Sequence, residues 1–172
     1  MKQTKRMPTH SVPRFPLPWR RAARTGALLI AVLAGTAAWA HGDVTPQAVD
    51  TAGLPKLGTE WRPENPFRAN PAAVKIGTSA YNQNCARCHG IEAISGGIAP
   101  DLRKLDNDCA SLKDAARKAA CVKEMDDIFL TTVRHGRTRN GAVYMPPFEG
   151  VMSQEAIWSI KAYLETRRDK PL

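Results

Sequence analysis

The sequence of 172 residues lacks internal repeats and low-complexity segments, and after residue 71 it has almost no strand-like alternation of apolar and polar positions. Its 43% apolar and 24% charged residues are not the composition of a disordered or fibrous chain. Because helical spacing is the periodic signal that remains, we expect one all-α domain with appendages.

The first 40 residues contain no Asp or Glu but seven Lys and Arg, and they lack an apolar run long enough for a membrane span. The apolar stretch 27–40 has 14 residues, whereas a transmembrane helix needs roughly 20. It ends in Ala38-Trp39-Ala40, a small-x-small pattern of the kind that signal peptidase cleaves. We predict a signal peptide over residues 1–40, cleaved after Ala40, with export to the periplasm by the general secretory route and no membrane anchor afterwards.

Most of the formal net charge of +9 belongs to this leader. Residues 41–172 hold eighteen Lys and Arg against sixteen Asp and Glu, so the exported chain carries only +2. This mixed charge gives no reason to expect nucleic-acid binding. Export also places the four cysteines in an oxidising compartment, where disulfides persist.

The exported chain divides into a proline-rich segment and a helical domain. Residues 41–71 contain five prolines and few periodic apolar positions, which predicts an extended N-terminal arm. Residues 72–172 form the predicted domain. Apolar stripes in it predict four helices: 72–84, 111–120, 123–135, and a last one from the cap Ser153 to Arg167-Arg168. Glycines and prolines predict loops over 90–100 and 136–152.

The strongest motif is Cys85-Ala86-Arg87-Cys88-His89. Two thiols three positions apart can add to the two vinyl groups of a haem, while the adjacent imidazole binds the iron from one face. A zinc site would need further cysteines or histidines at motif spacing, and a thioredoxin-like pair would need a βαβ context. We therefore predict one covalent haem c on Cys85 and Cys88, with His89 as an axial iron ligand.

A ligating histidine also needs an acceptor for its second ring nitrogen, because that hydrogen bond fixes the tautomer and orientation of the imidazole. The segment 96–100 can supply a backbone carbonyl, and Pro100 is the candidate. Pro100 can equally serve only to open the turn Pro100-Asp101-Leu102. Leu102 is then expected to pack against the porphyrin.

Met145 is the best candidate for the sixth iron ligand. It lies in Tyr144-Met145-Pro146-Pro147-Phe148, where two prolines stiffen a loop that can hold a thioether at the iron. Met125 and Met152 lie in a helical stripe and beside a helix cap, where methionine is more often structural. His135 is an alternative that would give bis-histidine ligation, and His41 is the remaining candidate. A His/Met pair favours outer-sphere electron transfer over chemistry on a substrate.

Cys109 and Cys121 stand outside any haem-attachment motif, so a second haem is excluded. In an oxidising compartment they are expected to form a disulfide across a short helical excursion. Closing that loop would contribute up to about 3 kcal/mol through the entropy of the unfolded chain. Two separate buried thiols are the alternative.

Over residues 72–168 the chain resembles the class I cytochromes c. The resemblance rests on a tyrosine-bearing helix that enters the Cys-x-x-Cys-His motif, on Pro100-Asp101-Leu102, on the Met145-Pro146 loop and on Tyr163 in the last helix. It implies a fold in which helices pack around one haem and the first and last helices cross. The contacts implied at this crossing join Gly77 and Tyr81 to Ile160, Tyr163 and Leu164.

Longer stretches are similar to a narrower group, the cytochromes c that accept electrons from quinoprotein (PQQ-dependent) ethanol dehydrogenases. These stretches are residues 81–90, 94–103 and 144–151, together with His41-Gly42-Asp43-Val44 and the extra cysteine pair. The resemblance implies a PQQ-dependent alcohol dehydrogenase as electron donor. A downstream cytochrome or a terminal oxidase would then accept the electrons.

The leading hypothesis is a monomeric periplasmic electron carrier that is not an enzyme, since small carriers must dissociate quickly from their partners. Two alternatives stay open: a haem enzyme or a gas or peroxide sensor with an open sixth position, and a disulfide-bonded domain without haem. Three arginines lie just upstream of Met145: Arg134, Arg137 and Arg139. One interpretation is that they steer an acidic partner toward the protein. The other is that they lie in a solvated loop or contact a haem propionate.

Overall fold

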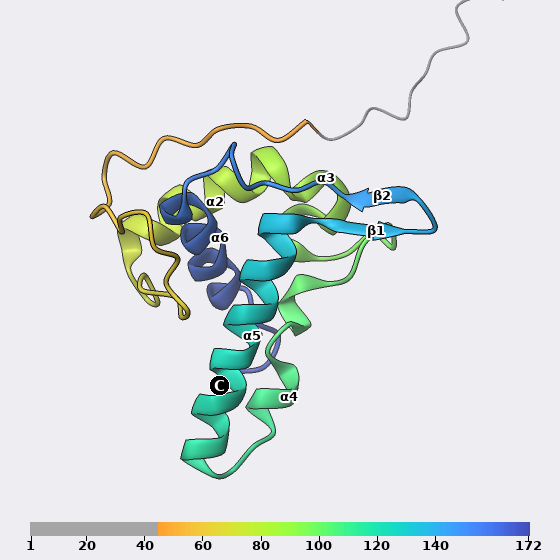
Figure 1. Ribbon diagram of the computed structural model, residues 1–172. Helices are drawn as coiled ribbons and strands as arrows, with labels where there is room; N and C mark the ends of the chain where they lie inside the picture. The colour runs from red at the N-terminus through yellow and green to blue at the C-terminus, as the bar shows by residue number, and fades with distance from the viewer. Residues whose placement is uncertain (1–44) are drawn as a thin grey trace, which may run out of the picture. The chain divides into compact units, whose positions relative to one another are not determined.

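The computed structural model describes residues 45–172 (Figure 1). The predicted signal peptide and its cleavage site after Ala40 lie outside these residues, and so does His41, a candidate iron ligand. The described part is mostly helical, with a small two-stranded sheet. The elements in chain order are α2 (Pro71–Asn84), α3 (Ala86–His89), the 3₁₀ turns η1 (Ile91–Ala93) and η2 (Leu102–Lys104), α4 (Asn107–Ala110), α5 (Ala115–His135), β1 (Arg137–Arg139), β2 (Ala142–Met145) and α6 (Gln154–Thr166). Within residues 45–172, no helix combines the length and the apolar character that a bilayer crossing requires.

The first and last helices of this part, α2 and α6, cross in close contact (Figure 1). The contact is close because Gly77 has no side chain: a Cβ there would lie 1.9 Å from the carbonyl oxygen of Ser159. One turn further along α2, the rings of Tyr81 and Tyr163 pack with their centroids 5.1 Å apart. Ser153 begins α6 as predicted, by accepting a hydrogen bond from the backbone N–H of Ala156. The helix crossing therefore has two of the contacts that the resemblance implies, between Gly77 and the backbone of Ile160 and between Tyr81 and Tyr163.

One helix, α5, takes the place of the two helices predicted over 111–120 and 123–135. Asp114 caps it by accepting a hydrogen bond from the N–H of Arg117, and the helix continues for 21 residues. The predicted break is wrong because residues 115–135 contain neither glycine nor proline, so nothing interrupts the backbone hydrogen bonds. Gly136, with a φ of 70°, ends α5 as predicted.

The segment 136–152 contains a β-hairpin, so the expectation of a loop there is wrong and the domain is not entirely helical. Strands β1 and β2 pair antiparallel, with Thr138 opposite Val143. Asn140 and Gly141 connect them with φ values of 51° and 77°. Two positive φ values are typical of the tight turn that closes a two-residue hairpin, and Asn-Gly is its usual sequence. The turn signal was thus present, but strands this short give too little alternation to be recognised.

Residues 45–70 contain no helix or strand, and side chains of the helices hold their backbone. Glu155 of α6 accepts a hydrogen bond from the N–H of Leu57 at 2.8 Å. Gln154 donates to the carbonyl of Gly58 at 2.8 Å. Phe67 is buried in the core. The guanidinium carbon of Arg134 lies over the Trp61 ring, 4.3 Å from the centroid of that ring. The polar first turn of α6 is therefore buried because it binds this segment.

A buried ionic cluster joins the same segment to α5 and α6. Lys161 has no exposed surface, and its Nζ lies 2.9 Å from Asp106 Oδ1 and 3.7 Å from Asp126 Oδ1. Burial by itself would raise the pKa of Asp106, but Lys161 and Arg168 outweigh it and hold that pKa below its usual value. Burial raises the pKa of Glu165, which lies 3.9 Å from Lys161. Arg68 also pairs with Asp126 and Glu165, so residues distant in sequence share one neutralised site.

The helix crossing generates a stability prediction for Gly77→Ala. We expect the free energy of unfolding to fall by at least about 2 kcal/mol, because the new methyl group would collide with the Ser159 carbonyl. Helix propensity alone would favour alanine by about 1 kcal/mol, so the two effects have opposite signs. Denaturant unfolding of the two proteins measures the difference. Gly96→Ala is the control, since a Cβ at Gly96 meets nothing within 4 Å; an equally stable Gly77→Ala protein would contradict the prediction.

Candidate functional site

A mostly apolar cleft lies between α5, α6 and the chain around α3. Its cavity volume is about 90 Å³, and it is partly open to solvent. The residues that line it come from five segments of the chain: Cys85, His89, Leu102, Leu105, Ile128, Phe129, Thr132, Val133, Met145, Ile160 and Leu164. The structure thus brings both residues predicted as axial ligands, His89 and Met145, to one cleft.

Helix α3 follows α2 with almost no interruption and carries the Cys-x-x-Cys-His motif on a single turn. The N–H of Cys85 still bonds to the carbonyl of Tyr81 at 2.8 Å, and the N–H of His89 bonds to the carbonyl of Cys85 at 2.9 Å. Cys85 faces the cleft, and Cys88 lies three positions further on the same turn. Neither thiol is in a disulfide, and burial raises the pKa of Cys85 to about 12.

The ring of His89 is oriented by the backbone carbonyl of Pro100. Its Nδ1 lies 2.9 Å from the Pro100 oxygen, so in the neutral tautomer Nδ1–H donates to that oxygen. Nε2 is then the unprotonated nitrogen, the form that binds a metal ion. Leu102, two residues later, lines the cleft. Pro100 and Leu102 therefore occupy the positions expected of them.

A tyrosine that the sequence reasoning placed only in the helix crossing also positions this turn. The Tyr81 hydroxyl donates to the carbonyl of Gly90, the residue after His89, at 2.7 Å. Burial raises the pKa of Tyr81, so the hydroxyl keeps the proton that it donates. The spacing of nine residues between donor and acceptor gives no periodic signal, which is why the sequence did not reveal this contact.

Met145 reaches the cleft from the end of β2. Arg137 pairs with Met145 and Thr138 with Val143, so Tyr144 is an extra, bulged residue. A bulge shifts the alternation of side chains by one position, and Met145 is the only residue of either strand that is partly buried. The backbone of Met145 and Pro147 packs against Gly136, where a Cβ would lie 2.3 Å from the Met145 oxygen.

The other candidates for the sixth ligand lie elsewhere. His135 is exposed, and its Nε2 is 3.3 Å from Glu149 Oε2. Met152 is buried in the core, and Met125 is not among the residues that line the cleft. Most of the apolar lining belongs to α5 and α6, whose stripes were predicted, but the sequence did not show which members of a stripe would face a cleft instead of the core.

Cys109 and Cys121 are joined by a disulfide, with their Cα atoms 5.5 Å apart. The bond links α4 to the N-terminal half of α5. It lies outside the set of residues that line the cleft. In the structure this cysteine pair therefore belongs to the scaffold.

The donor set of the cleft fits a covalently attached haem better than a free metal ion. Within the described chain, no three His, Cys, Asp or Glu side chains gather as a structural metal site would require. The cleft offers instead one imidazole, one thioether and a thiol in apolar surroundings. These groups suit a large apolar macrocycle with iron at its centre.

Comparison with known proteins supports this assignment. Residues 72–164 match the family model described as cytochrome c oxidase, cbb3-type, subunit III. Cytochrome c550 of Pseudomonas aeruginosa is 52% identical over 146 residues, which cover 82% of this chain and 91% of that protein. No solved structure gave a significant match.

Two larger relatives share only a segment. The quinohemoprotein alcohol dehydrogenase ADH-IIG of Pseudomonas putida is 33% identical over 106 residues, which are 61% of this chain but 12% of that enzyme. The quinohemoprotein alcohol dehydrogenase ADH IIB of Pseudomonas putida is 32% identical over 106 residues, 62% of this chain and 13% of the enzyme. Each of these proteins therefore contains a segment similar to this chain within a much longer polypeptide.

The contact between Gly136 and the Met145–Pro147 backbone predicts that Gly136→Ala is destabilising. We expect the free energy of unfolding to fall by about 3 kcal/mol, from a strained left-handed backbone and from collision with the Met145 carbonyl. Gly141→Ala is a matched control, because Gly141 has a similar φ of 77° but open space around its Cβ. Denaturant unfolding of both variants separates strain from collision. Equal losses would show that the close approach contributes nothing.

Proposed function

We propose, from the premise that this chain is a class I c-type cytochrome with covalently bound haem c, that it carries single electrons in the periplasm and receives them from a PQQ-dependent alcohol dehydrogenase. The family relationship supports a mono-haem electron-transfer protein. The donor, the compartment and the individual residue roles are the further steps of the proposal.

The residues of the cleft have distinct roles in this proposal. Cys85 and Cys88 would form the thioether bonds, and His89 and Met145 would bind the iron. Pro100 holds the His89 ring through its carbonyl, and Leu102 covers the porphyrin. When bound, the haem supplies an iron that alternates between two oxidation states. The protein residues hold this iron in one geometry and keep water away from it.

The observation that carries the proposal is the chemical character of the cleft lining. Among the residues that line the cleft there is no Asp, Glu, Lys or Arg, and the polar side chains are His89, Thr132 and the Cys85 thiol. General acid–base catalysis needs a group that takes up or donates protons in reach of the reacting atoms. With His89 and Met145 used as ligands and Cys85 bound to the haem, only the Thr132 hydroxyl remains as a polar side chain, and the cleft suits outer-sphere electron transfer.

The partially matching relatives support the choice of donor. In two quinohemoprotein alcohol dehydrogenases, a segment similar to this chain is part of the enzyme's own polypeptide. A separate protein with a similar module can accept electrons from a dehydrogenase without being part of its polypeptide. We infer that the acceptor is a downstream cytochrome or a terminal oxidase, and that the carrier is a monomer so that it can exchange partners quickly.

The proposed location depends on two features of the chain. Residues 1–40 have the pattern of a signal peptide, and the Cys109–Cys121 disulfide suits an oxidising compartment. Residues 41–71 would then be the N-terminal arm of the mature protein. Within that segment, residues 45–70 lie against the helices, and the backbone of Leu57 and Gly58 is hydrogen-bonded to side chains of α6.

The ligand assignment is tested by Met145→Ala. We expect the ferric protein to lose the weak long-wavelength absorption band of methionine-ligated haem, and the ferrous protein to bind carbon monoxide rapidly, because the sixth position opens. The reduction potential should fall as well, since methionine ligation raises it. Met125→Ala, outside the cleft, is the control. Unchanged spectra in Met145→Ala would move the assignment to His135 and favour an enzyme or sensor.

The proposed donor is tested by mixing the ferric protein with a purified PQQ-dependent alcohol dehydrogenase and its alcohol. We expect the haem absorbance to change to the ferrous form with a rate that rises with dehydrogenase concentration. Omission of the alcohol is the control. A ferric protein that hydroquinone reduces but the dehydrogenase with alcohol does not would disprove this donor.

A further inference from the structure

We propose that the β1–β2 hairpin, residues 137–145, is the element on which the electron donor docks, and that the donor meets it with an acidic rim around an apolar contact. This inference rests on the proposed function. It assigns a role to the exposed side chains of this hairpin, which neither the fold nor the cleft explains.

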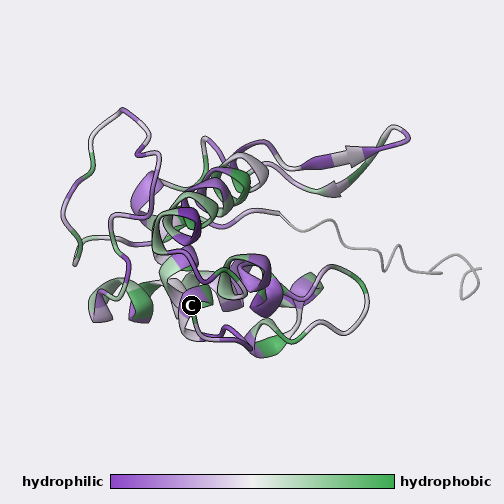
Figure 2. Ribbon diagram, turned by 90° about the horizontal axis from the view of Figure 1, so that it is seen from below, coloured by the Kyte–Doolittle hydropathy of each residue, from purple (hydrophilic) through white to green (hydrophobic). Residues whose placement is uncertain are grey.

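The hairpin contributes almost nothing to the packing of the domain. It extends away from the helices in two perpendicular views (Figures 1 and 2). Every residue of β1 is exposed, and in β2 only Met145 is partly covered. Val143 and Tyr144 leave 65% and 68% of their surface in solvent. A two-stranded hairpin without a packed face is only marginally stable by itself, so large apolar side chains on it need another explanation.

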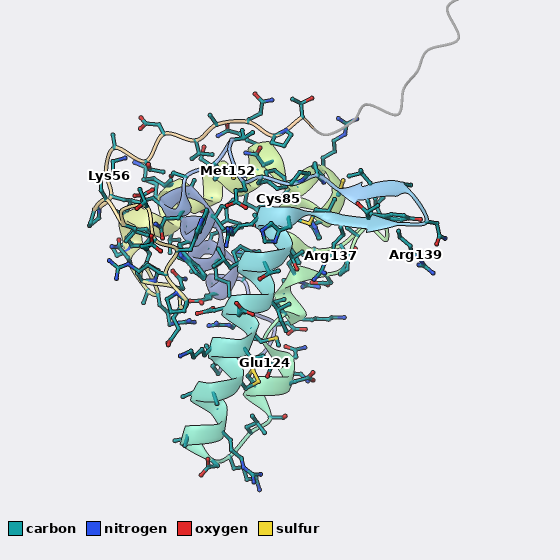
Figure 3. All side chains as sticks on the ribbon, in the orientation of Figure 1. Lys56, Cys85, Glu124, Arg137, Arg139 and Met152 are labelled. Atoms are coloured by element: carbon teal, nitrogen blue, oxygen red, sulfur yellow. A yellow bond between two sulfur atoms is a disulfide. The ribbon has the colours of Figure 1, made fainter. Side chains whose placement is uncertain are left out.

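The hairpin also carries positive charge that the fold does not neutralise. The labelled side chains Arg137 and Arg139 lie along it (Figure 3), and within residues 45–172 neither has a carboxylate within 4.0 Å. Arg137 bonds only to the hydroxyl of Thr132, at 2.5 Å. No Asp or Glu occurs from residue 134 to residue 148. Within the described residues, no carboxylate of the chain neutralises the charge of this element.

Arg134 belongs to the fold and not to this surface. Its guanidinium stacks on Trp61 and bonds to Glu149 Oε1 at 2.7 Å. Of the three arginines that the sequence placed near Met145, the structure therefore leaves Arg137 and Arg139 for a partner. The distinction is tertiary, because Trp61 comes from a distant part of the chain.

The position of the hairpin suits electron transfer. Tyr144 is the bulged residue directly before Met145, so a partner that packs on Tyr144 and Val143 is one residue from a proposed iron ligand. Electron transfer rates fall steeply with distance, and a transient complex must place two redox centres close together through a small interface. Arginine with tyrosine is also a typical composition for such contacts.

A second exposed apolar surface lies in the loop that follows His89. Ile91 and Ile98 leave 77% and 78% of their surface in solvent. Glu92 in the same loop pairs with Arg167 at 2.9 Å, and Asp101 pairs with Arg103. Exposed Arg87, in the Cys-x-x-Cys-His motif, precedes this loop in the chain, so the loop can also meet an acidic partner. It is the competing docking site that the experiment must separate from the hairpin.

The experiment compares charge reversals of equal size at two places. Arg137→Glu/Arg139→Glu changes the hairpin, and Lys113→Glu/Arg117→Glu changes two exposed positions next to the start of α5. The second-order rate of reduction by the purified PQQ-dependent alcohol dehydrogenase is measured from low to high ionic strength, and binding to the immobilised dehydrogenase is measured in parallel. We expect the hairpin variant to lose about tenfold in rate and in affinity at low salt, and the control less than about twofold. The difference should disappear at high salt.

Two further variants test the apolar contact. Val143→Ser should weaken binding at every salt concentration, whereas Ile98→Ser should not. Reduction by uncharged hydroquinone and the circular dichroism spectrum show that each variant is folded and contains functional haem. If the wild type is reduced but the two charge-reversed proteins behave alike, or if only Ile98→Ser weakens binding, the hairpin proposal is wrong and the proposed function stands. If the wild type itself is not reduced by the dehydrogenase, both proposals fail.

Discussion

The close crossing of α2 and α6 at Gly77 is the constraint on which the rest of the structure depends. Because the two backbones touch there, α3 and its Cys-x-x-Cys-His motif are held at a fixed place relative to Ile160 and Leu164, which line the cleft. Tyr81, in the same crossing, donates a hydrogen bond from its hydroxyl to the carbonyl of Gly90, the residue after His89. A single glycine thus connects helix packing to the geometry of a proposed iron ligand.

The second half of the cleft depends on a different kind of contact. Met145 is held by backbone against backbone at Gly136 and by a bulge in a short hairpin, and its partly buried side chain packs against the edge of the core. Such a loop can keep a thioether in place while the hairpin before it remains in solvent. In this arrangement a proposed ligand and a proposed docking surface are parts of one element, so partner binding and iron ligation are physically adjacent.

Residues 45–70 and the buried ionic cluster show how an irregular segment can be part of a core. Lys161 and Arg168 neutralise Asp106 in the interior, and Arg68 brings the segment into the same cluster. Buried charges of this kind are costly unless every partner is present, so the cluster specifies one arrangement of the segment on α5 and α6. No periodic pattern in the sequence indicates such a network, because its members are single polar residues far apart in the chain.

The sequence by itself determined the haem chemistry, the mainly helical domain and most helix ends, because motif spacing, capping residues and apolar stripes are local signals. The comparisons confirm the family and the haem c that it predicted. Only the tertiary structure decided that α5 is one helix, that Asn140-Gly141 turns a hairpin, and which arginine near Met145 is neutralised by Glu149. These outcomes depend on contacts between distant residues, whose energies no local pattern records.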